Sequence, residues 1–166
     1  LSAQGRSCAT ISRSLASLKN FFAYLVSSGF LRETPVQHVH VERGEKKLPQ
    51  ILTGREVELL LSQPACVDAK GYRDRAMLEV MYATGLRVSE LIGLNVEDVS
   101  LDGCFVKCGG KKTRLVPMYP GAVKALSNYM REVRPGMVAA PGEPALFVNV
   151  SGERMSRQGF WKILKH

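Results

Sequence analysis

Residues 82–94 read YATGLRVSELIGL, a stretch that is typical of the junction between two helices. An apolar helix is closed by Gly85, the residue type that most often ends helices in a left-handed conformation. A short helix over about 88–93 follows, and Arg87 stands at the corner. Its guanidinium offers five N–H donors, which can hold a phosphate in a two-pronged contact. Glu90, three residues further on, is placed to orient Arg87 by a charge-assisted bond.

An isolated Arg–Glu pair at this spacing is most often an ordinary surface ion pair without a function. The rest of the chain therefore decides between a surface pair and a phosphate site. Working outward from the junction, apolar periodicity and end signals predict a mostly helical domain of the α+β class. Its helices are expected from the Thr53 capping box to Pro64, at about 71–84, 88–93 and 120–134, and from Ser156 onward.

Residues 96–117 predict a small antiparallel sheet within this domain. Short β-type runs are separated by turns rich in glycine and lysine, which is the pattern of a hairpin. The strands are expected at about 96–101, 104–107 and 113–117.

The first forty residues predict a separate helix over about 7–27, stopped by Gly29. Apolar residues recur on it with spacings of four and three, forming one stripe: Ile11, Leu15, Leu18, Phe22 and Leu25. A lone amphipathic helix cannot bury such a stripe, so further helices are expected upstream of it. A polar segment without periodicity, residues 38–50, follows as a linker.

Charge and composition narrow the partner class. The 166 residues carry a net charge of +8, shared equally between residues 1–50 and the remainder. A positive charge on both parts favours a polyanion that contacts both. No apolar run reaches the ~20 residues that span a bilayer, and the four cysteines form no metal-binding motif, so we expect a cytoplasmic protein without membrane or metal.

Several stretches, in the right order, resemble one known family. Residues 73–76 read RDRA and residues 82–91 read YATGLRVSEL, which together resemble the first catalytic box of the tyrosine recombinases, especially the bacterial Xer type. Residues 113–117, TRLVP, resemble the outgoing strand of that family's β-hairpin. Residues 47–57 are similar to the start of its catalytic domain, and residues 11–35 to the end of its helical core-binding domain.

The resemblance implies three parts: the C-terminal part of a helical core-binding (SAM-like) domain at 1–37, a linker at 38–50, and the N-terminal part of the catalytic domain at 51–166. It implies site-specific DNA recombination, in which a tyrosine attacks a phosphodiester and forms a 3′-phosphotyrosyl link without any cofactor. The implied partners are double-stranded DNA and a homo- or hetero-tetramer of recombinase subunits. The second catalytic box and the tyrosine lie further downstream in the family, so this chain alone is expected to be inactive.

Site residues carry over one by one. Arg87 matches the first catalytic arginine, and Glu90 the acidic residue beside it. The hairpin lysine, the family's general acid, is a departure, because alignment on Arg114 without gaps places Gly109 there. Lys111 is the first substitute, with Lys107 as the alternative, and Arg87 is expected in a positively charged concavity near these lysines. DNA phosphates are expected to be held by Arg6, Arg13, Lys19, Lys112 and Arg114, with weaker candidates at Arg154, Arg157 and Lys162.

Three alternatives stay open at this point. A relative that binds DNA without cutting it is favoured by Gly109 and disfavoured by the unbroken box around Arg87. The natural element can be a chromosome, as for typical Xer proteins, or a phage, transposon or integron. The third alternative, and the least specific, is a helical protein that binds other proteins and whose positive charge has no role in binding DNA.

Overall fold

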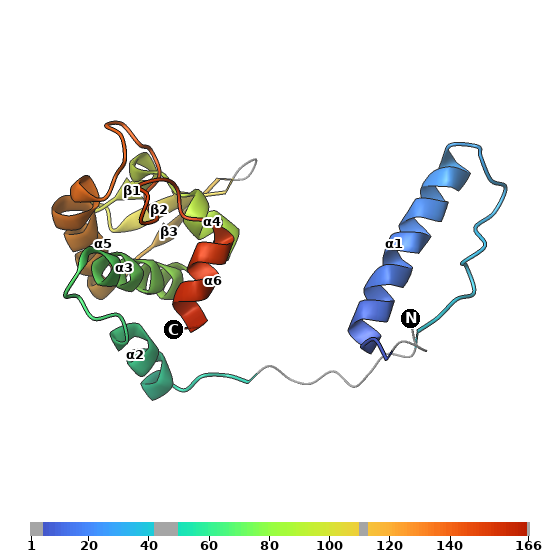
Figure 1. The fold of residues 1–166 in the computed structure, drawn as a ribbon, viewed down its shortest axis with the longest axis horizontal. Helices are drawn as coiled ribbons and strands as arrows, with labels where there is room; N and C mark the ends of the chain where they lie inside the picture. The colour runs from blue at the N-terminus through green and yellow to red at the C-terminus, as the bar shows by residue number, and fades with distance from the viewer. Residues whose placement is uncertain (1–4, 42–49, 110–112, 166) are drawn as a thin grey trace. The chain divides into compact units, whose positions relative to one another are not determined.

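The computed structural model describes residues 5–41, 50–109 and 113–165. Its contacts divide the chain into two compact units, Leu1–Ile51 and Leu52–His166 (Figure 1), and each is described by itself. The described residues of the first unit contain a single helix, whereas those of the second contain the sheet and the other helices.

In the first unit, α1 (Cys8–Ser27) confirms the predicted helix. Ser7 caps its start, since the serine hydroxyl accepts a hydrogen bond of 3.3 Å from the N–H of Thr10. Gly29, just past its end, has φ +77°, the left-handed conformation that the sequence predicted. No residue of α1 is buried, and Leu18 of the apolar stripe is 48% exposed. The described residues of this unit therefore leave much of the stripe uncovered.

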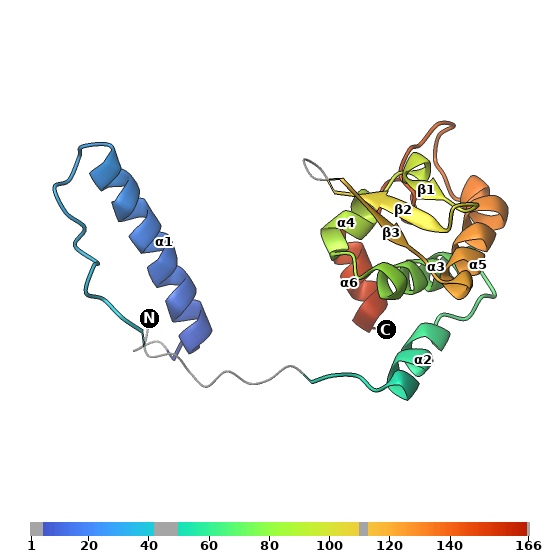
Figure 2. The same ribbon diagram turned by 180° about the vertical axis from the view of Figure 1, so that it is seen from behind.

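The core of the second unit surrounds α3 (Ala69–Thr84), where Met77 and Val80 are fully buried. The helix α5 (Pro120–Asn128) packs along α3, and both lie on the same side of the sheet in Figures 1 and 2. The segment 145–148 also is fully buried. The apolar helix that the sequence predicts before Gly85 is therefore central to the core.

The predicted small sheet is present and is antiparallel, in the order β1 (Val99–Ser100), β2 (Phe105–Cys108) and β3 (Arg114–Pro117). The first strand of the hairpin begins one residue later than expected, because Cys104 has φ 54° and belongs to the preceding turn. Side chains alternate between the faces of a strand, so Lys107 is exposed while both of its neighbours on β2 are buried.

The remaining helices follow the predicted start and end signals. The capping box of Thr53 and Glu56 is formed at the start of α2, and Ser156 accepts a hydrogen bond of 3.0 Å from Gly159 at the start of α6. The bounds are α2 Gly54–Ser62, α4 Val88–Gly93 and α6 Arg157–Lys165. The strand expected at about 96–101 is wrong in its first half, because residues 96–98 form the short 3-10 helix η2 (Val96–Asp98) and only β1 is extended.

The helix predicted at about 120–134 is present, but its type changes beyond Asn128. There the backbone widens into a π-helical turn, η3 (Tyr129–Val133), and then tightens into η4 (Arg134–Gly136). The Tyr129 ring is fully buried and stacked on Phe147, with centroids 5.6 Å apart, and its hydroxyl donates to the carbonyl of Leu146 over 3.2 Å. We attribute the change of helix type to the anchoring of this large side chain, because a wider turn accommodates it.

Two features of α3 were not expected from its sequence. Arg73 and Glu79 are buried, whereas Tyr82, in the apolar second half of the helix, is 58% exposed. Arg73 forms an ion pair with Asp74 over 2.7 Å, and Glu79 pairs with Arg75 over 2.8 Å. Each buried charge therefore has a partner of opposite sign, as burial of an ionised group requires.

Candidate functional site

Arg87 occupies a rigid corner between α3 and α4. Gly85 ends α3 with φ 61°, and its N–H donates to the carbonyl of Met81 over 2.9 Å. Leu86 is 2% exposed and anchors the corner in the core, while the Arg87 side chain is 81% exposed. The backbone of Arg87 is thus fixed on both sides, and its guanidinium extends into solvent where it can meet a ligand.

Glu90 holds the backbone of this corner. One carboxylate oxygen, Oε2, accepts a hydrogen bond of 2.8 Å from the Arg87 N–H. The other, Oε1, lies 3.7 Å from Nη1 of Arg87, which is beyond hydrogen-bonding distance. The N–H bond is the main cause that lowers the pKa of Glu90, and the nearby Arg114 lowers it further. Glu90 therefore acts first as the N-terminal cap of α4, and its contact with the Arg87 guanidinium is secondary.

Arg114, at the start of β3, approaches the same carboxylate. Its Nη2 donates to Oε2 of Glu90 over 3.2 Å, across 24 positions of sequence. The Arg114 side chain is 48% exposed, and that of Glu90 is 17% exposed. The sequence placed Arg114 among the DNA contacts and gave no sign of this pairing, because the two residues belong to different elements, β3 and α4, that meet only in the folded unit.

The far end of α4 is held by Arg154. Its Nη1 donates to the carbonyls of Ile92 over 2.9 Å and Leu94 over 3.0 Å, and its Nη2 donates to Oδ1 of Asn95. These carbonyls lie at the negative end of the helix dipole, where a cation is favourable. The weak expectation of a phosphate contact at Arg154 gives way to an internal role, while Arg157 is exposed on α6.

A hollow of about 340 Å³ lies beside α4 and β2. Its lining includes Glu90, Asp98 and Lys107 but not Arg87. Among the residues that the structure describes, this hollow is therefore not the positively charged concavity that the sequence predicted around Arg87. Lys111, the first candidate for the general acid, and Lys112, a predicted phosphate contact, lie outside the described residues. Lys107, the alternative general acid, lines this hollow together with Glu90.

The basic residues predicted on the first unit are accessible to differing extents. Arg6 and Arg13 are exposed, and Lys19 is half-buried on α1. The structure determines each unit by itself, so these residues and Arg87 are described as two separate groups.

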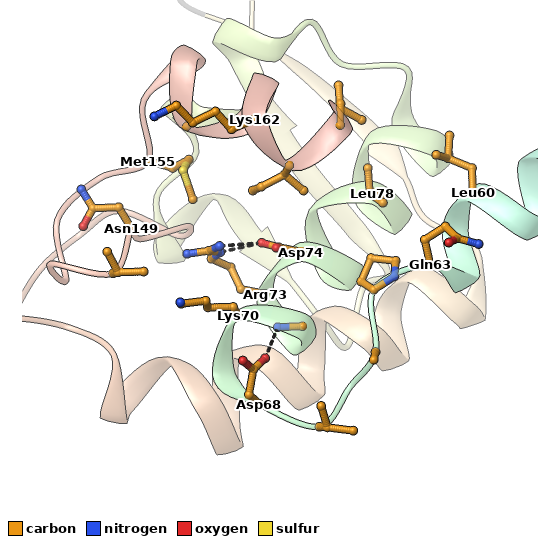
Figure 3. A pocket seen from close by; sticks show the side chains of 18 residues that line it. Leu60, Gln63, Asp68, Lys70, Arg73, Asp74, Leu78, Asn149, Met155 and Lys162 are labelled. Carbon is orange, nitrogen blue, oxygen red and sulfur yellow. Dashed lines mark hydrogen bonds and ion pairs between the residues drawn. The ribbon is translucent and has the colours of Figure 1, made fainter. Parts of the chain in front are cut away.

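A larger pocket, of about 770 Å³, lies between α2, α3 and α6 (Figure 3). Apolar side chains such as Leu60, Leu78 and Met155 line much of it. In Figure 3 the guanidinium of Arg73 points to Asp74 in its wall, and the same guanidinium donates to the carbonyl of Val148 over 3.2 Å. Arg73 and Asp74 thus satisfy each other in this wall, whereas Lys70 and Lys162, which also line the pocket, form no ion pair among the described residues.

Across residues 5–41, 50–109 and 113–165, no cluster of three histidine, cysteine or acidic side chains is arranged to hold a metal ion. Within the same described ranges, none of the helices has both the length and the apolarity needed to cross a membrane.

Comparison with known proteins places the chain in a family. Residues 50–166 match the phage integrase family, and the chain belongs to it. The XerD tyrosine recombinase of Oceanobacillus iheyensis is 45% identical over 165 residues, and that of Halalkalibacterium halodurans is 41% identical over 164. Each alignment covers 98% of this chain and 55% of the relative. The chain thus spans about half the length of the curated relatives that it matches.

Solved structures support the same fold. The integrase of the transposon Tn1549, determined in complex with a circular intermediate DNA, superposes with a TM-score of 0.74 at 21% identity. The match covers 99% of this chain and 60% of that one. The resemblance found in the sequence, to tyrosine recombinases of Xer type, is therefore confirmed at the level of family and fold.

Proposed function

We propose that this chain forms part of a site-specific DNA recombinase, which cuts and rejoins DNA through a 3′-phosphotyrosyl intermediate. The observation that carries the proposal is the Arg87 corner. Its backbone is fixed by Gly85, Leu86 and Glu90, yet its guanidinium is 81% exposed and makes no hydrogen bond among the described residues. Positive charge fixed in advance is what stabilises a phosphate as negative charge develops on it.

In the proposed reaction Arg87 donates to the non-bridging oxygens of the scissile phosphate. Lys111, or Lys107 in its place, protonates the leaving 5′ oxygen, and Glu90 positions Arg87. The attacking tyrosine, the second arginine and the histidines come from the part of the relatives that this chain does not match. The cleavage energy is kept in the phosphotyrosyl bond, so rejoining consumes neither ATP nor a metal ion.

The domain assignment follows from the same proposal. Residues 1–37 belong to the core-binding domain, residues 38–50 to the linker and residues 51–166 to the catalytic domain. Of the five basic residues predicted to contact DNA, Arg6, Arg13, Lys19 and Lys112 hold phosphates, whereas Arg114 is bound to Glu90. Recombinase subunits assemble as a tetramer on double-stranded DNA in the cytoplasm, and resolution of chromosome dimers is the role that the Xer-type relatives favour.

The test uses a chimera, because the chain spans about half of its relatives. Residues 1–166 replace the matching part of the Oceanobacillus XerD, and the chimera is incubated with a nicked suicide form of that recombinase's DNA target. A covalent protein–DNA adduct is expected. DNA binding without any adduct, under conditions in which the parent XerD forms one, would contradict the enzyme and favour a DNA-binding relative that does not cut.

The chain itself provides a second test. Residues 1–166 are expected to bind DNA weakly and without sequence preference. If about four basic side chains reach phosphates, the plot of log affinity against log salt has a slope of roughly −3.6, from about −0.9 per phosphate. Affinity that does not change with salt contradicts a phosphate-binding surface.

A further inference from the structure

We infer that Arg114 is a positioning residue, which acts on the Arg87 corner through Glu90 and does not bind DNA directly. The inference rests on the proposed function, because it concerns the same phosphate site. It changes the role that the sequence gave to Arg114, from a phosphate contact to a link between the hairpin and α4.

The geometry of Glu90 carries the first step. Its Oε2 accepts from two donors that come from different elements, the Arg87 N–H over 2.8 Å and Nη2 of Arg114 over 3.2 Å. The side chain of Glu90 is only 17% exposed. This one oxygen atom therefore links Arg114, the first residue of β3, to the backbone of Arg87.

The second step concerns charge. An acidic group beside a phosphate-binding arginine competes with the phosphate for that arginine. Here the charge of Glu90 is directed to Arg114, while the Arg87 guanidinium stays 3.7 Å away and keeps its donors. The other charged groups that line the adjoining hollow are Asp98 and Lys107. Arg114 thus offsets the carboxylate that caps α4 and leaves Arg87 available.

The third step concerns the hairpin. Arg114 faces Cys108 in the register of β2 and β3, so it sits where the strands enter the turn that carries Lys111 in the sequence. The hydrogen bond from Arg114 to Glu90 connects the start of β3 to the Arg87 corner. The start of β3 and the backbone of Arg87 are then held by a single carboxylate, and misplacement of a catalytic group by about 1 Å can cost about 100-fold in rate.

The experiment begins on the chain itself, with carbon-13 NMR titration of the Glu90 side chain. The wild-type midpoint is expected below the ordinary glutamate pKa of about 4.3. Arg114→Gln is expected to raise it, and Arg114→Lys to restore part of the change. Arg131→Gln, a change at an exposed arginine on η3, serves as the control and leaves the midpoint in place. An unchanged midpoint in Arg114→Gln overturns the inference.

Cleavage by the chimera gives the second readout. Arg114→Gln is expected to slow single-turnover cleavage by about 10-fold or more, since positioning is lost, while DNA affinity and its salt slope stay close to wild type. Recovery of rate by Arg114→Lys distinguishes this from a general loss of folding. A salt slope reduced by about 0.9, with cleavage restored at saturating protein, identifies Arg114 as a phosphate contact and overturns the inference.

The two proposals fail separately. If the wild-type chimera forms no adduct but Arg114→Gln still raises the pKa of Glu90, the recombinase function is contradicted and the local tie remains. If the chimera cleaves and Arg114→Gln changes neither the titration nor the rate, the function remains and the inference is refuted.

Discussion

Replacing Arg154 by alanine should destabilise the second unit, although the side chain is half-buried and belongs to a loop. Its guanidinium donates three hydrogen bonds, two to the carbonyls of Ile92 and Leu94 and one to the side chain of Asn95. These bonds close the C-terminal end of α4, a helix of six residues that cannot be stable alone. The substitution therefore loosens the element that presents Arg87.

The expected loss of folding free energy follows from the hydrogen-bond acceptors that lose their donor when Arg154 is removed. The Leu94 carbonyl keeps a second partner, the N–H of Leu146 over 2.9 Å, so its loss is small. The Ile92 carbonyl and the Asn95 amide oxygen both lose a charged donor, which costs about 1–3 kcal/mol each. Water reaches this half-buried site and reduces the loss, so we expect a total of about 2–4 kcal/mol.

The assay is urea unfolding followed by the fluorescence of Trp161, the single tryptophan of the chain. With a slope of about 1–3 kcal/mol per molar urea, a loss of 3 kcal/mol lowers the midpoint by roughly 1–3 M. Arg131→Ala, at an exposed arginine, is the control and should stay within about 0.5 kcal/mol of wild type. If Arg154→Ala unfolds like the control but weakens DNA binding, Arg154 is a phosphate contact, and its role in holding the C-terminal end of α4 is refuted.

Three further changes test the same structure by urea unfolding. Gly85→Ala should cost about 1–2 kcal/mol, because φ 61° is strained for alanine while no atom lies within 4 Å of the added Cβ. Lowering the pH below about 4 should destabilise the unit, because folding lowers the pKa values of Glu56 and Glu90. Their contribution to stability as helix caps is lost as the pH falls through those values, so a protein with both Glu56→Gln and Glu90→Gln should show a flatter dependence of stability on pH. Tyr119→Phe removes the hydrogen bond to a buried carboxylate and should cost about 1 kcal/mol, allowing for solvent around the ring. The matched controls are Gly93→Ala for Gly85→Ala and Tyr82→Phe for Tyr119→Phe, and each should stay within about 0.5 kcal/mol of wild type. A control that destabilises the unit as much as its partner contradicts the role given to that partner. A pH dependence that the glutamine variant retains contradicts the role given to the two glutamates.

Local signals in the sequence were sufficient for most of the fold. Gly85, the Thr53 capping box and the hairpin turn act within a few residues, so each predicts its element without knowledge of the rest. The α5 helix shows the limit. Its pattern continues to Arg134, but the buried Tyr129 contacts Phe147, eighteen residues away, and that tertiary contact determines the turn.

The site was predictable in part, for the same reason. Arg87 and Glu90 are neighbours in one motif, so their proximity could be read from the sequence. The partners Arg114 and Arg154 reach α4 from 24 and about 60 positions away, and the sequence predicted both as phosphate contacts. The sequence around a basic residue does not tell whether it binds the end of a helix or a phosphate, and only the structure distinguishes the two.

The central claim is that Arg87 stabilises the phosphate during cleavage, and the most direct test is Arg87→Ala in the chimera. Single-turnover cleavage of the DNA target is measured at saturating protein, together with DNA affinity in the same buffer. Loss of a donor that acts on developing negative charge costs about 100- to 1000-fold in rate. We predict a loss of that size with affinity within a few-fold of wild type, whereas cleavage at the wild-type rate would remove Arg87 from the mechanism.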